Sequence, residues 1–520
     1  MKRKWHALID GFTFPLVMMF IGMILLAIGN TFTSAYVTSY INVSNQFFQT
    51  FFAACKYIGS LMVQFFPLML LLNILGKRYN DSIPIIGGFS CYVLLHIMTM
   101  FFAPQGLPSY CYVSIMGLQL DLSQLLGTSR TLTPLHMGLI AALVVMLIIR
   151  TVYKWSRQRL NYGLFTFIDN DTWFFIVSAI LTVAIGIGIS YTYIYFINLL
   201  LRIFNFIAAD LSNPASLFIY GLMERLLELL GLSDIIHSNF WFSTLGGTWT
   251  SALGVVYNGD ISVWTAQFAA TAVEKGVGRL ITPYYVINLF IVPSLIIGIY
   301  LHYTNRQHRQ RVTGLFILTI ITSLLSSSLV PLEFFLLISA PELLGFHVVL
   351  SSMLYGIFDV AGVYLGYNYS GVLAYATPGA LTSLLGYLSY PDLAHDIRWV
   401  LGTGVVSFAI YQGLTWVYYE YLAQDFLDHF AAIRRRKTFV KGLGGINNVR
   451  LIDATPTTVS AVVYDPTHVD FDLLKEAGAY LVTENRFGYD IDIGPGAVML
   501  RRDIRTELKC YLKIPVQKND

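Results

Sequence analysis

The feature of this chain that most constrains its fold is a series of long stretches without any charged residue. A helix needs about 20 apolar residues to cross the hydrocarbon core of a bilayer. The charge-free, apolar stretches of this order are 11–55, 57–76, 82–120, 131–149, 172–201, 280–305, 312–332, 360–391 and 399–419. This recurrence predicts a helical protein that crosses a membrane many times.

Charged residues are concentrated in the last hundred positions. Only 12% of the chain is Asp, Glu, Lys or Arg, against about 25% in soluble domains, which excludes an ordinary soluble enzyme. Of the 33 basic and 30 acidic residues, 27 lie in 421–520. We therefore expect a membrane domain over 1–421, a basic linker over 422–441 and a small soluble domain over 442–514.

Two regions interrupt the series of predicted spans. Residues 203–279 and 333–359 contain Gly, Pro and isolated charges, so short amphipathic or re-entrant pieces are expected there. Irregular backbone is tolerated at membrane depth only where it is buried in protein or lines a wet cavity. The predicted fold class is a polytopic α-helical membrane domain of about ten spans plus re-entrant segments, followed by a small α/β cytoplasmic domain.

Basic residues set the expected orientation. Lys and Arg cluster beside the first, second and fourth predicted spans, and again at Arg306–Arg311 and Arg434–Lys437. Such residues are enriched in cytoplasmic loops. All these clusters fall on one side if residues 203–279 make no net crossing. We therefore expect a multi-pass protein of the plasma (inner) membrane with both termini in the cytoplasm.

The tail has the pattern of a small α/β domain. Residues 449–452, 459–464 and 497–500 are rich in apolar and β-branched side chains and are predicted as strands. Residues 471–477 end at a glycine and are predicted as a helix, with a further helix over 501–512.

An adjacent carboxylate and guanidinium are the first candidate for a binding site. Glu224 and Arg225 lie in a largely apolar segment, and an ionisable residue within a membrane is costly and by default functional. The aromatic run 240–242 and Trp249 follow closely, and aromatic faces with a few hydrogen-bonding groups suit a sugar ring. The alternative is a helix-surface pair at the membrane boundary, with the aromatic residues as interfacial anchors.

A second carboxylate follows a proline between two apolar stretches. The run Ser326-Ser-Ser-Leu-Val-Pro-Leu-Glu ends at Glu333 and predicts a broken helix whose backbone and carboxylate bind hydroxyl groups. The alternative is a helix boundary that Glu333 caps. Asp359, with Asn368 and Tyr375 downstream, is a weaker candidate, because single polar residues in spans more often serve helix–helix contacts.

Other chemistry is not indicated. His96 and His237 stand alone without metal-ligand spacing and are expected to be structural. The sequence has no phosphate-binding loop, dinucleotide fingerprint or zinc-protease motif, so no metal or cofactor is expected. Nucleic acid is not an expected partner, because no basic face with interleaved aromatics occurs. No ring of carboxylates or chain of buried acids is evident, which argues against an ion channel or pump.

Several motifs resemble the glucose-type sugar permeases of the bacterial phosphotransferase system. Tyr220-Gly-Leu-Met-Glu-Arg-Leu-Leu and Asn239-Phe-Trp-Phe are similar to motifs of their membrane domain, IIC, and Pro331-Leu-Glu-Phe-Phe is similar to its later carboxylate motif. In the tail, Leu443-Gly-Gly-Ile-Asn-Asn-Val and Leu451-Ile-Asp-Ala resemble the fused phosphoryl-carrier domain, IIB. The resemblance covers nearly the whole chain, in the order IIC then IIB.

The resemblance implies a chemistry that this chain lacks at its central position. In the family, a IIA protein phosphorylates a cysteine of IIB, which passes the phosphoryl group to a sugar held in IIC. Here Thr455 stands at the cysteine position, and Thr458 and Ser460 replace two arginines. A threonine hydroxyl without a base is a weak nucleophile. The chain thus resembles a protein-phosphocysteine–sugar phosphotransferase, but no catalytic residue is expected.

The sugar-binding positions of the family are partly changed as well. Ser233 and Asp234 stand where the family has two histidines, and Val330 replaces a sugar-contacting glutamate. The substrate-binding residues expected from the retained and substituted positions are Glu224, Arg225, Ser233, Asp234, Trp241 and Glu333.

Three functions are compatible with these motifs. The first is carbohydrate transport by a IIC-IIB-like permease without its own phosphoryl transfer, with IIA or IIB carriers on other chains as conceivable partners. The second is a non-transporting sugar receptor or regulatory protein whose IIB-like tail docks a partner. The third is an active sugar phosphotransferase permease. The resemblance also implies a homodimer surrounded by membrane lipid.

Overall fold

The computed structural model describes most of the chain, with short gaps. The described residues are 2–40, 45–79, 81–104, 106–113, 120–121, 131–157, 169–271, 273–304, 306–326, 330–369, 377–422, 429–485 and 488–512.

Long apolar helices dominate the first 422 residues. Within the described ranges, seven helical segments are long and apolar enough to cross a membrane. They are α1 (Lys2–Thr33), α5 (Ser82–Phe102), α7 (Leu139–Arg157), α8 (Asn170–Ala208), α12–α13 (Thr282–Val286 and Val292–Leu301, joined by the π-helical turn Ile287–Ile291), α16 (Pro341–Ala361) and α18 (Ala394–Val417, continued by the π-helical turn Tyr418–Leu422). An eighth span results if α3 (Gln46–Gln64) and α4 (Phe66–Tyr79), bent by 48°, are counted as one. The predicted polytopic helical membrane domain is confirmed.

Further helices and two strand pairs lie between these spans; all but α14 (Arg306–Ser326) are short. They are α2 (Ala35–Tyr40), α9 (Pro214–Leu229), α10 (Ser233–Trp241), α11 (Asp260–Ala269), α14 (Arg306–Ser326), α15 (Val330–Ser339), α17 (Leu381–Tyr387), and the strand pairs β1 (Leu120–Asp121) with β2 (Thr131–Leu132) and β3 (Thr248–Thr250) with β4 (Val256–Asn258). The short helices α9 to α11 and the β3–β4 hairpin confirm the interrupted structure predicted for residues 203–279.

Two predicted segments of this region have different outcomes. Residues 333–359 are interrupted as expected, because α15 ends at Ser339 and α16 begins at Pro341, but α16 itself is one continuous helix. Pro341 occupies its first turn, where a missing N–H costs nothing. The helix ends at Gly362, whose φ of +65° is a left-handed conformation that suits glycine. Residues 360–391 were expected to span the membrane, but the longest helix among their described residues is the short α17.

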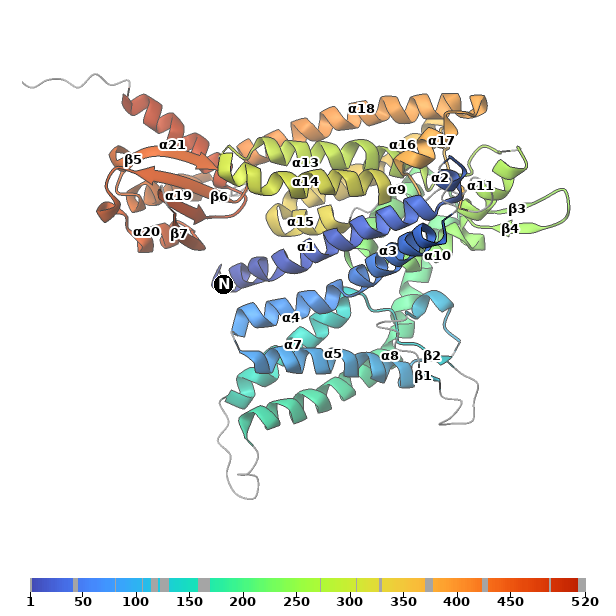
Figure 1. Cartoon of the computed structure of the whole chain (residues 1–520), viewed down its shortest axis with the longest axis horizontal. Helices are drawn as coiled ribbons and strands as arrows, with labels where there is room; N and C mark the ends of the chain where they lie inside the picture. The colour runs from blue at the N-terminus through green and yellow to red at the C-terminus, as the bar shows by residue number, and fades with distance from the viewer. Residues whose placement is uncertain are drawn as a thin grey trace, which may run out of the picture.

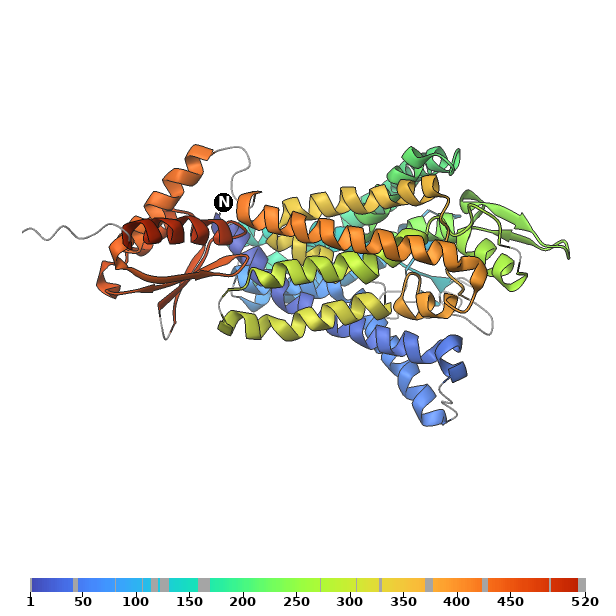
Figure 2. The ribbon, with the colours of Figure 1, turned by 90° about the horizontal axis from the view of Figure 1, so that it is seen from above.

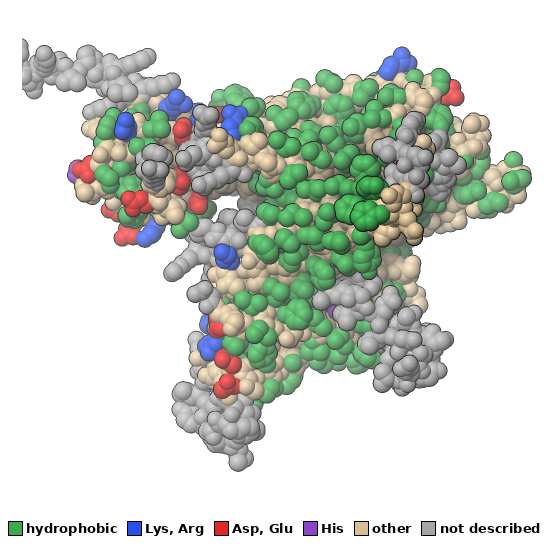
Figure 3. Space-filling model, viewed as in Figure 1, with side chains coloured by type: hydrophobic (Ala, Val, Ile, Leu, Met, Phe, Trp, Pro, Cys, Tyr) green, Lys and Arg blue, Asp and Glu red, His purple; other side chains and the backbone are tan. Residues whose placement is uncertain are grey.

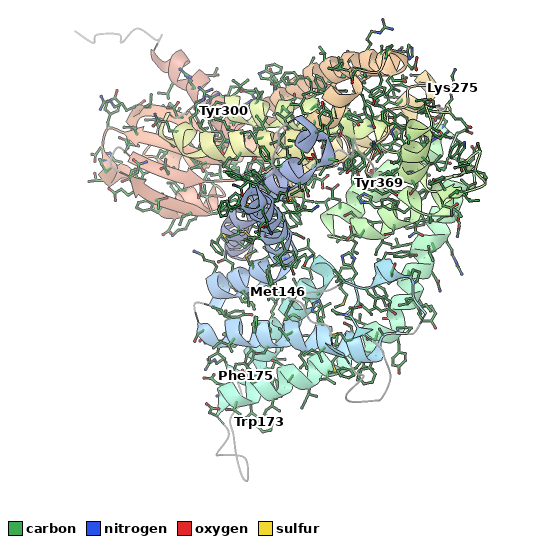
Figure 4. The ribbon with its side chains drawn as sticks, turned by 45° about the vertical axis from the view of Figure 1, so that its right-hand side comes forward. Met146, Trp173, Phe175, Lys275, Tyr300 and Tyr369 are labelled. Atoms are coloured by element: carbon green, nitrogen blue, oxygen red, sulfur yellow. The ribbon has the colours of Figure 1, made fainter. Side chains whose placement is uncertain are left out.

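The spans form an elongated body with a small α/β unit at one end and the β3–β4 hairpin at the other (Figure 1). Seen from above, α13, α14, α16 and α18 lie side by side along this body (Figure 2). Hydrophobic side chains cover its middle, and charged side chains gather on the α/β unit (Figure 3). Tyr300 lies near the α/β unit and Lys275 near the opposite end (Figure 4).

The α/β unit contains four antiparallel strands in the order β5-β6-β8-β7 and three helices. Its elements are α19 (His429–Gly442), β5 (Val449–Ala454), β6 (Thr458–Val463), α20 (Phe471–Glu476), β7 (Leu481–Asn485), β8 (Gly488–Asp492) and α21 (Ala497–Leu512). The segment expected as a linker, 422–441, includes α19, whose Phe439 is buried in the core of the unit.

The secondary structure predicted for the tail is mostly confirmed. The strands at 449–452 and 459–464 and the helix ending before Gly478 are present, but residues 497–500 begin α21 instead of forming a strand. The buried Leu500 and Ile504 are four residues apart, which is helical spacing, so these apolar residues continue the helix expected at 501–512.

Candidate functional site

Helix α9 carries the first pair of candidates on a face that packs closely against α16. Pro214 occupies its first turn. At Gly221, an added Cβ would lie 2.8 Å from the Tyr355 ring and 2.9 Å from the Cα of Ser352, so a larger residue would push the two helices apart. This close approach brings the Tyr355 hydroxyl to Glu224.

Glu224 is fully buried and is bound through both carboxylate oxygens. Tyr284 donates its hydroxyl to Oε1, and Tyr355 donates its hydroxyl to Oε2. His237 Nε2 lies 3.1 Å from Oε1, and Arg225 Nη2 lies 3.4 Å from Oε2. A buried carboxylate is tolerated when it is paired and hydrogen-bonded, and Glu224 meets both conditions through groups from four helices.

Arg225 contacts three carboxylates. Besides Glu224, its Nη1 lies 2.8 Å from Glu228 Oε2 and 3.6 Å from Glu333 Oε1. Its side chain is only 1% exposed, and its guanidinium carbon lies 5.3 Å from the centre of the Tyr284 ring. Glu333, on α15, is fully buried, so the two carboxylates singled out from distant motifs meet at one guanidinium.

Helix α10 supplies a flat aromatic surface. Ser233 and Asp234 begin this helix, and His237 and Trp241 follow at four-residue spacing on one side of it. The His237 and Trp241 rings stack with centroids 3.6 Å apart and an interplanar angle of 11°. Trp241 Nε1 donates to the Tyr220 hydroxyl at 3.1 Å, which fixes the plane of the indole.

A cavity of about 490 Å³ opens beside this aromatic pair. The polar, tyrosine and tryptophan side chains in its lining are Gln64, Tyr92, His136, Glu228, Ser233, Asp234, His237, Trp241 and Tyr284. The rest of the wall is largely apolar and includes residues of α1, α3, α4, α7 and α15. The volume lies in the range of about 300–1,000 Å³ that is usual for small-molecule sites. A larger groove of about 680 Å³ between α16 and α18 has a largely apolar lining that includes none of these residues.

The six residues predicted to bind substrate lie in two adjoining layers. The cavity wall holds Ser233, Asp234 and Trp241, and the buried cluster holds Glu224, Arg225 and Glu333. Glu228 and His237 belong to both layers, because each lines the cavity and contacts the cluster.

Other aromatic and polar candidates lie elsewhere. Phe242 is 48% exposed, and Trp249 Nε1 donates to Glu274 at 3.2 Å, outside the cavity. Asp359 Oδ1 lies 3.4 Å from Arg279 Nη1 and does not reach the cluster. Asn368 is buried away from the cavity lining, and Tyr375 lies outside the described residues.

Several residues of this site were not identified from the sequence. His237 was expected to be structural but lines the cavity and contacts Glu224, and its four-residue spacing from Trp241 was the available signal. Glu228 lies one turn after Glu224 on α9. Tyr284 and Tyr355 gave no signal, because the chain has 33 tyrosines and nothing local distinguishes these two.

Thr455, which the motif resemblance predicts to stand at the phosphocysteine position, begins the turn between β5 and β6. It is buried, and its Oγ1 accepts the Thr458 N–H at 2.9 Å. Thr458 Oγ1 donates to Asp492 at 2.5 Å, and Ser460 Oγ donates to Asp490 at 2.6 Å. The two positions at which the resemblance predicts arginines thus carry hydroxyl groups that are bound to carboxylates.

The same turn is docked on the helical body. The Thr304 N–H, just beyond α13, donates to the Ala454 carbonyl at 3.1 Å, and the Ala454 N–H donates to Thr304 Oγ1 at 3.0 Å. Nearby, Arg501 and Arg502 of α21 lie 3.8 and 3.6 Å from carboxylate oxygens of Glu420. The α/β unit therefore contacts the ends of two spans.

The fold and the site together define a class: a multi-pass helical membrane protein with a cavity lined by polar, aromatic and apolar side chains, and a small α/β unit at one end. No protein-family model matches the chain. It is, however, 26% identical over 321 residues to a protein of Staphylococcus saprophyticus named PTS system glucose-specific EIICBA component, a match that covers 59% of this chain and 44% of that protein.

A second relative of the same name, from Staphylococcus carnosus, is 25% identical over 309 residues, which cover 56% of this chain and 43% of the relative. The matched region is thus less than half the length of either relative. These similarities support the resemblance that the motifs indicated: the chain is a homologue of glucose-type permeases of the phosphotransferase system.

Proposed function

We propose that the chain binds a carbohydrate in the cavity beside His237 and Trp241 and carries it across the membrane. The observation that supports this most directly is the stacked aromatic pair, bordered by the carboxylates of Glu228 and Asp234. A sugar ring has apolar C–H faces that pack on aromatic rings and hydroxyl edges that bind to carboxylates. The glucose-specific relatives support the same substrate class.

We further propose that transport proceeds without phosphoryl transfer from the chain's own α/β unit. A phosphoryl group carries a negative charge close to two and is stabilised by arginines and backbone N–H groups. Around Thr455, Asp490 and Asp492 would repel that charge, and they accept hydrogen bonds from the residues that replace the arginines.

Sugar uptake by purified protein in vesicles tests these proposals. Labelled candidate sugars are offered with and without the general phosphotransferase components. Uptake that does not need these components supports the proposed carrier. Sugar phosphate formed only in their presence would instead establish an active phosphotransferase permease, and sugar binding without uptake would indicate a receptor.

Thr455→Cys is expected not to restore phosphorylation. The variant regains the thiol but keeps Asp490 and Asp492 beside the turn, and Thr458 and Ser460 still stand at the positions where the resemblance places arginines. We expect no more labelled phosphate on the protein or on sugar than with the unmodified chain, which retains Cys510 as the matched thiol control. Robust sugar phosphate formation by this single variant would show that the surrounding residues do not prevent the reaction.

We place the α/β unit, and with it both chain termini, on the cytoplasmic side of the membrane. The start of α1 and the ends of α4 and α7 lie at the same end of the helical body as the α/β unit (Figure 1). The last turns of α4 and α7 carry Lys77, Arg78, Lys154 and Arg157, as cytoplasmic ends typically do. The division into IIC-like and IIB-like domains and the homodimer stay predictions.

A further inference from the structure

The buried cluster behind the cavity has more negative than positive groups. Arg225 contacts Glu224, Glu228 and Glu333 at 3.4, 2.8 and 3.6 Å, so three carboxylates share one guanidinium. Glu224 and Glu333 have no exposed side-chain surface, and Glu228 is 12% exposed. Like charges repel strongly where water is excluded. Full ionisation of this cluster is therefore costly, and a proton on one carboxylate removes much of the cost.

Other groups around the cluster do not supply a second permanent cation. The titratable side chains that face it from the packed elements are His237 of α10, Tyr284 of α12, His347 and Tyr355 of α16, and Tyr411 of α18. None of these side chains carries a permanent positive charge. Within the part of the chain that the structure describes, the excess negative charge can thus be offset only by protons.

Of the three carboxylates, Glu333 has the weakest contacts with groups that could stabilise its negative charge. Neither of its oxygens has a hydrogen-bond partner among the described residues, and its one ion-pair contact, with Arg225, is the longest of the three. Glu224, by contrast, has two tyrosine donors, His237 and Arg225 around it. An ionised carboxylate without hydrogen bonds in a dry interior is costly, whereas its protonated form is neutral. The proton is therefore expected on Glu333.

The same cluster is connected to the cavity through Glu228. Glu228 lines the cavity wall and is held by Arg225 at 2.8 Å. With a proton on Glu333, Arg225 remains on Glu228. Without that proton, Glu333 competes for the same guanidinium and draws it from the cavity wall. Protonation of Glu333 and sugar binding beside Glu228 therefore favour each other, and such coupling is reciprocal.

We propose that the chain is a proton–sugar symporter in which the proton is carried on Glu333. This inference rests on the proposed function as a sugar carrier. The only bond made and broken is the O–H bond of the Glu333 carboxyl group: the proton comes from water on the loading side and returns to water on the other side. The proton gradient then drives accumulation in place of the phosphoryl group used by the family. Ionisable residues that relay protons in transporters occupy similar buried positions.

The test measures protons and sugar together in vesicles that contain the full chain and a pH-sensitive dye. A panel of radiolabelled glucose, mannose, N-acetylglucosamine, maltose and trehalose is first screened by equilibrium binding, and those that bind are offered in sodium-free buffer under an inward proton gradient. We expect about one proton to enter for each sugar molecule, and sugar to accumulate only while the gradient lasts. Glu333→Gln is expected to bring the proton-to-sugar ratio close to zero, and Glu333→Asp, which keeps the acid, to retain it.

Glu342→Gln is the matched control, because Glu342 is bound to the Tyr418 hydroxyl at 2.8 Å and lies outside the cluster. It is expected to keep the ratio of the unmodified chain. Sugar uptake without proton entry, or uptake that requires sodium, would overturn the symporter and leave the carrier intact. A Glu333→Gln protein that still moves protons with sugar would overturn the assignment to Glu333. Failure of every sugar to bind would overturn the proposed carrier itself, and with it this inference.

Discussion

Arg225→Met is expected to destabilise the helical body more than the loss of any single surface charge. Arg225 is the cation shared by Glu224, Glu228 and Glu333, and methionine fills much of its volume without a charge. Removing one partner of a buried ion pair costs about 3–5 kcal/mol, because the remaining charge stays buried without compensation. We expect the midpoint of thermal aggregation in detergent, measured by size-exclusion chromatography after heating, to fall by at least about 5 °C.

Two control variants test whether the lost stability comes from uncompensated buried charge or from a packing defect. Arg398→Met removes an exposed arginine of α18 and is expected to leave the midpoint nearly unchanged. Adding Glu228→Gln and Glu333→Gln to Arg225→Met removes two of the three carboxyl groups that lose their shared cation and should recover part of the stability. A triple variant no more stable than Arg225→Met alone would mean that the carboxylates are not the source of the cost, which would weaken the electrostatic account of the cluster.

The sequence predicted most of the spans but missed one for a definable reason. Helix α16 has Glu342 in its first turn and Asp359 in its last, so its charge-free interior is shorter than a full span. Charges at helix ends are compatible with a membrane helix, because they lie near the interface, and a search for charge-free stretches cannot allow for this. The prediction of a span over 360–391 was wrong for the opposite reason. This segment is free of charges, but Gly362, Gly366 and Pro378 interrupt it.

The candidate site was predicted as a set of residues and not as an arrangement. Glu224 and Glu333 stood out because each is an ionisable group in an apolar segment. Their meeting at Arg225 depends on the packing of α9 against α15 and α16, which involves contacts between residues far apart in the sequence. The sequence, in which no ring of carboxylates or chain of buried acids was evident, did not indicate this group of three carboxylates around one arginine. Glu228 was overlooked because one further glutamate on a helix is usually exposed.

Trp241→Ala is expected to have the largest effect on sugar binding. Trp241 forms half of the stacked aromatic surface in the cavity, and its removal also frees His237 from the position in which it contacts Glu224. We expect the affinity for the sugar identified by equilibrium binding to fall by at least about tenfold, which corresponds to about 1.4 kcal/mol. Trp241→Phe keeps an aromatic face and should retain most of the affinity, although it loses the hydrogen bond to Tyr220.

Trp249→Ala is the matched control for this effect. Trp249 lies on the β3–β4 hairpin, donates to Glu274 and does not line the cavity, so its removal should leave the affinity unchanged. The thermal midpoint of each variant shows whether a loss of binding reflects a loss of fold. A loss of affinity in a stable Trp249→Ala, together with full affinity in a stable Trp241→Ala, would mean that sugar binds at the hairpin end of the body. In that case the cavity beside His237 would not be the binding site, and the carboxylate cluster behind it would have no sugar to couple to a proton.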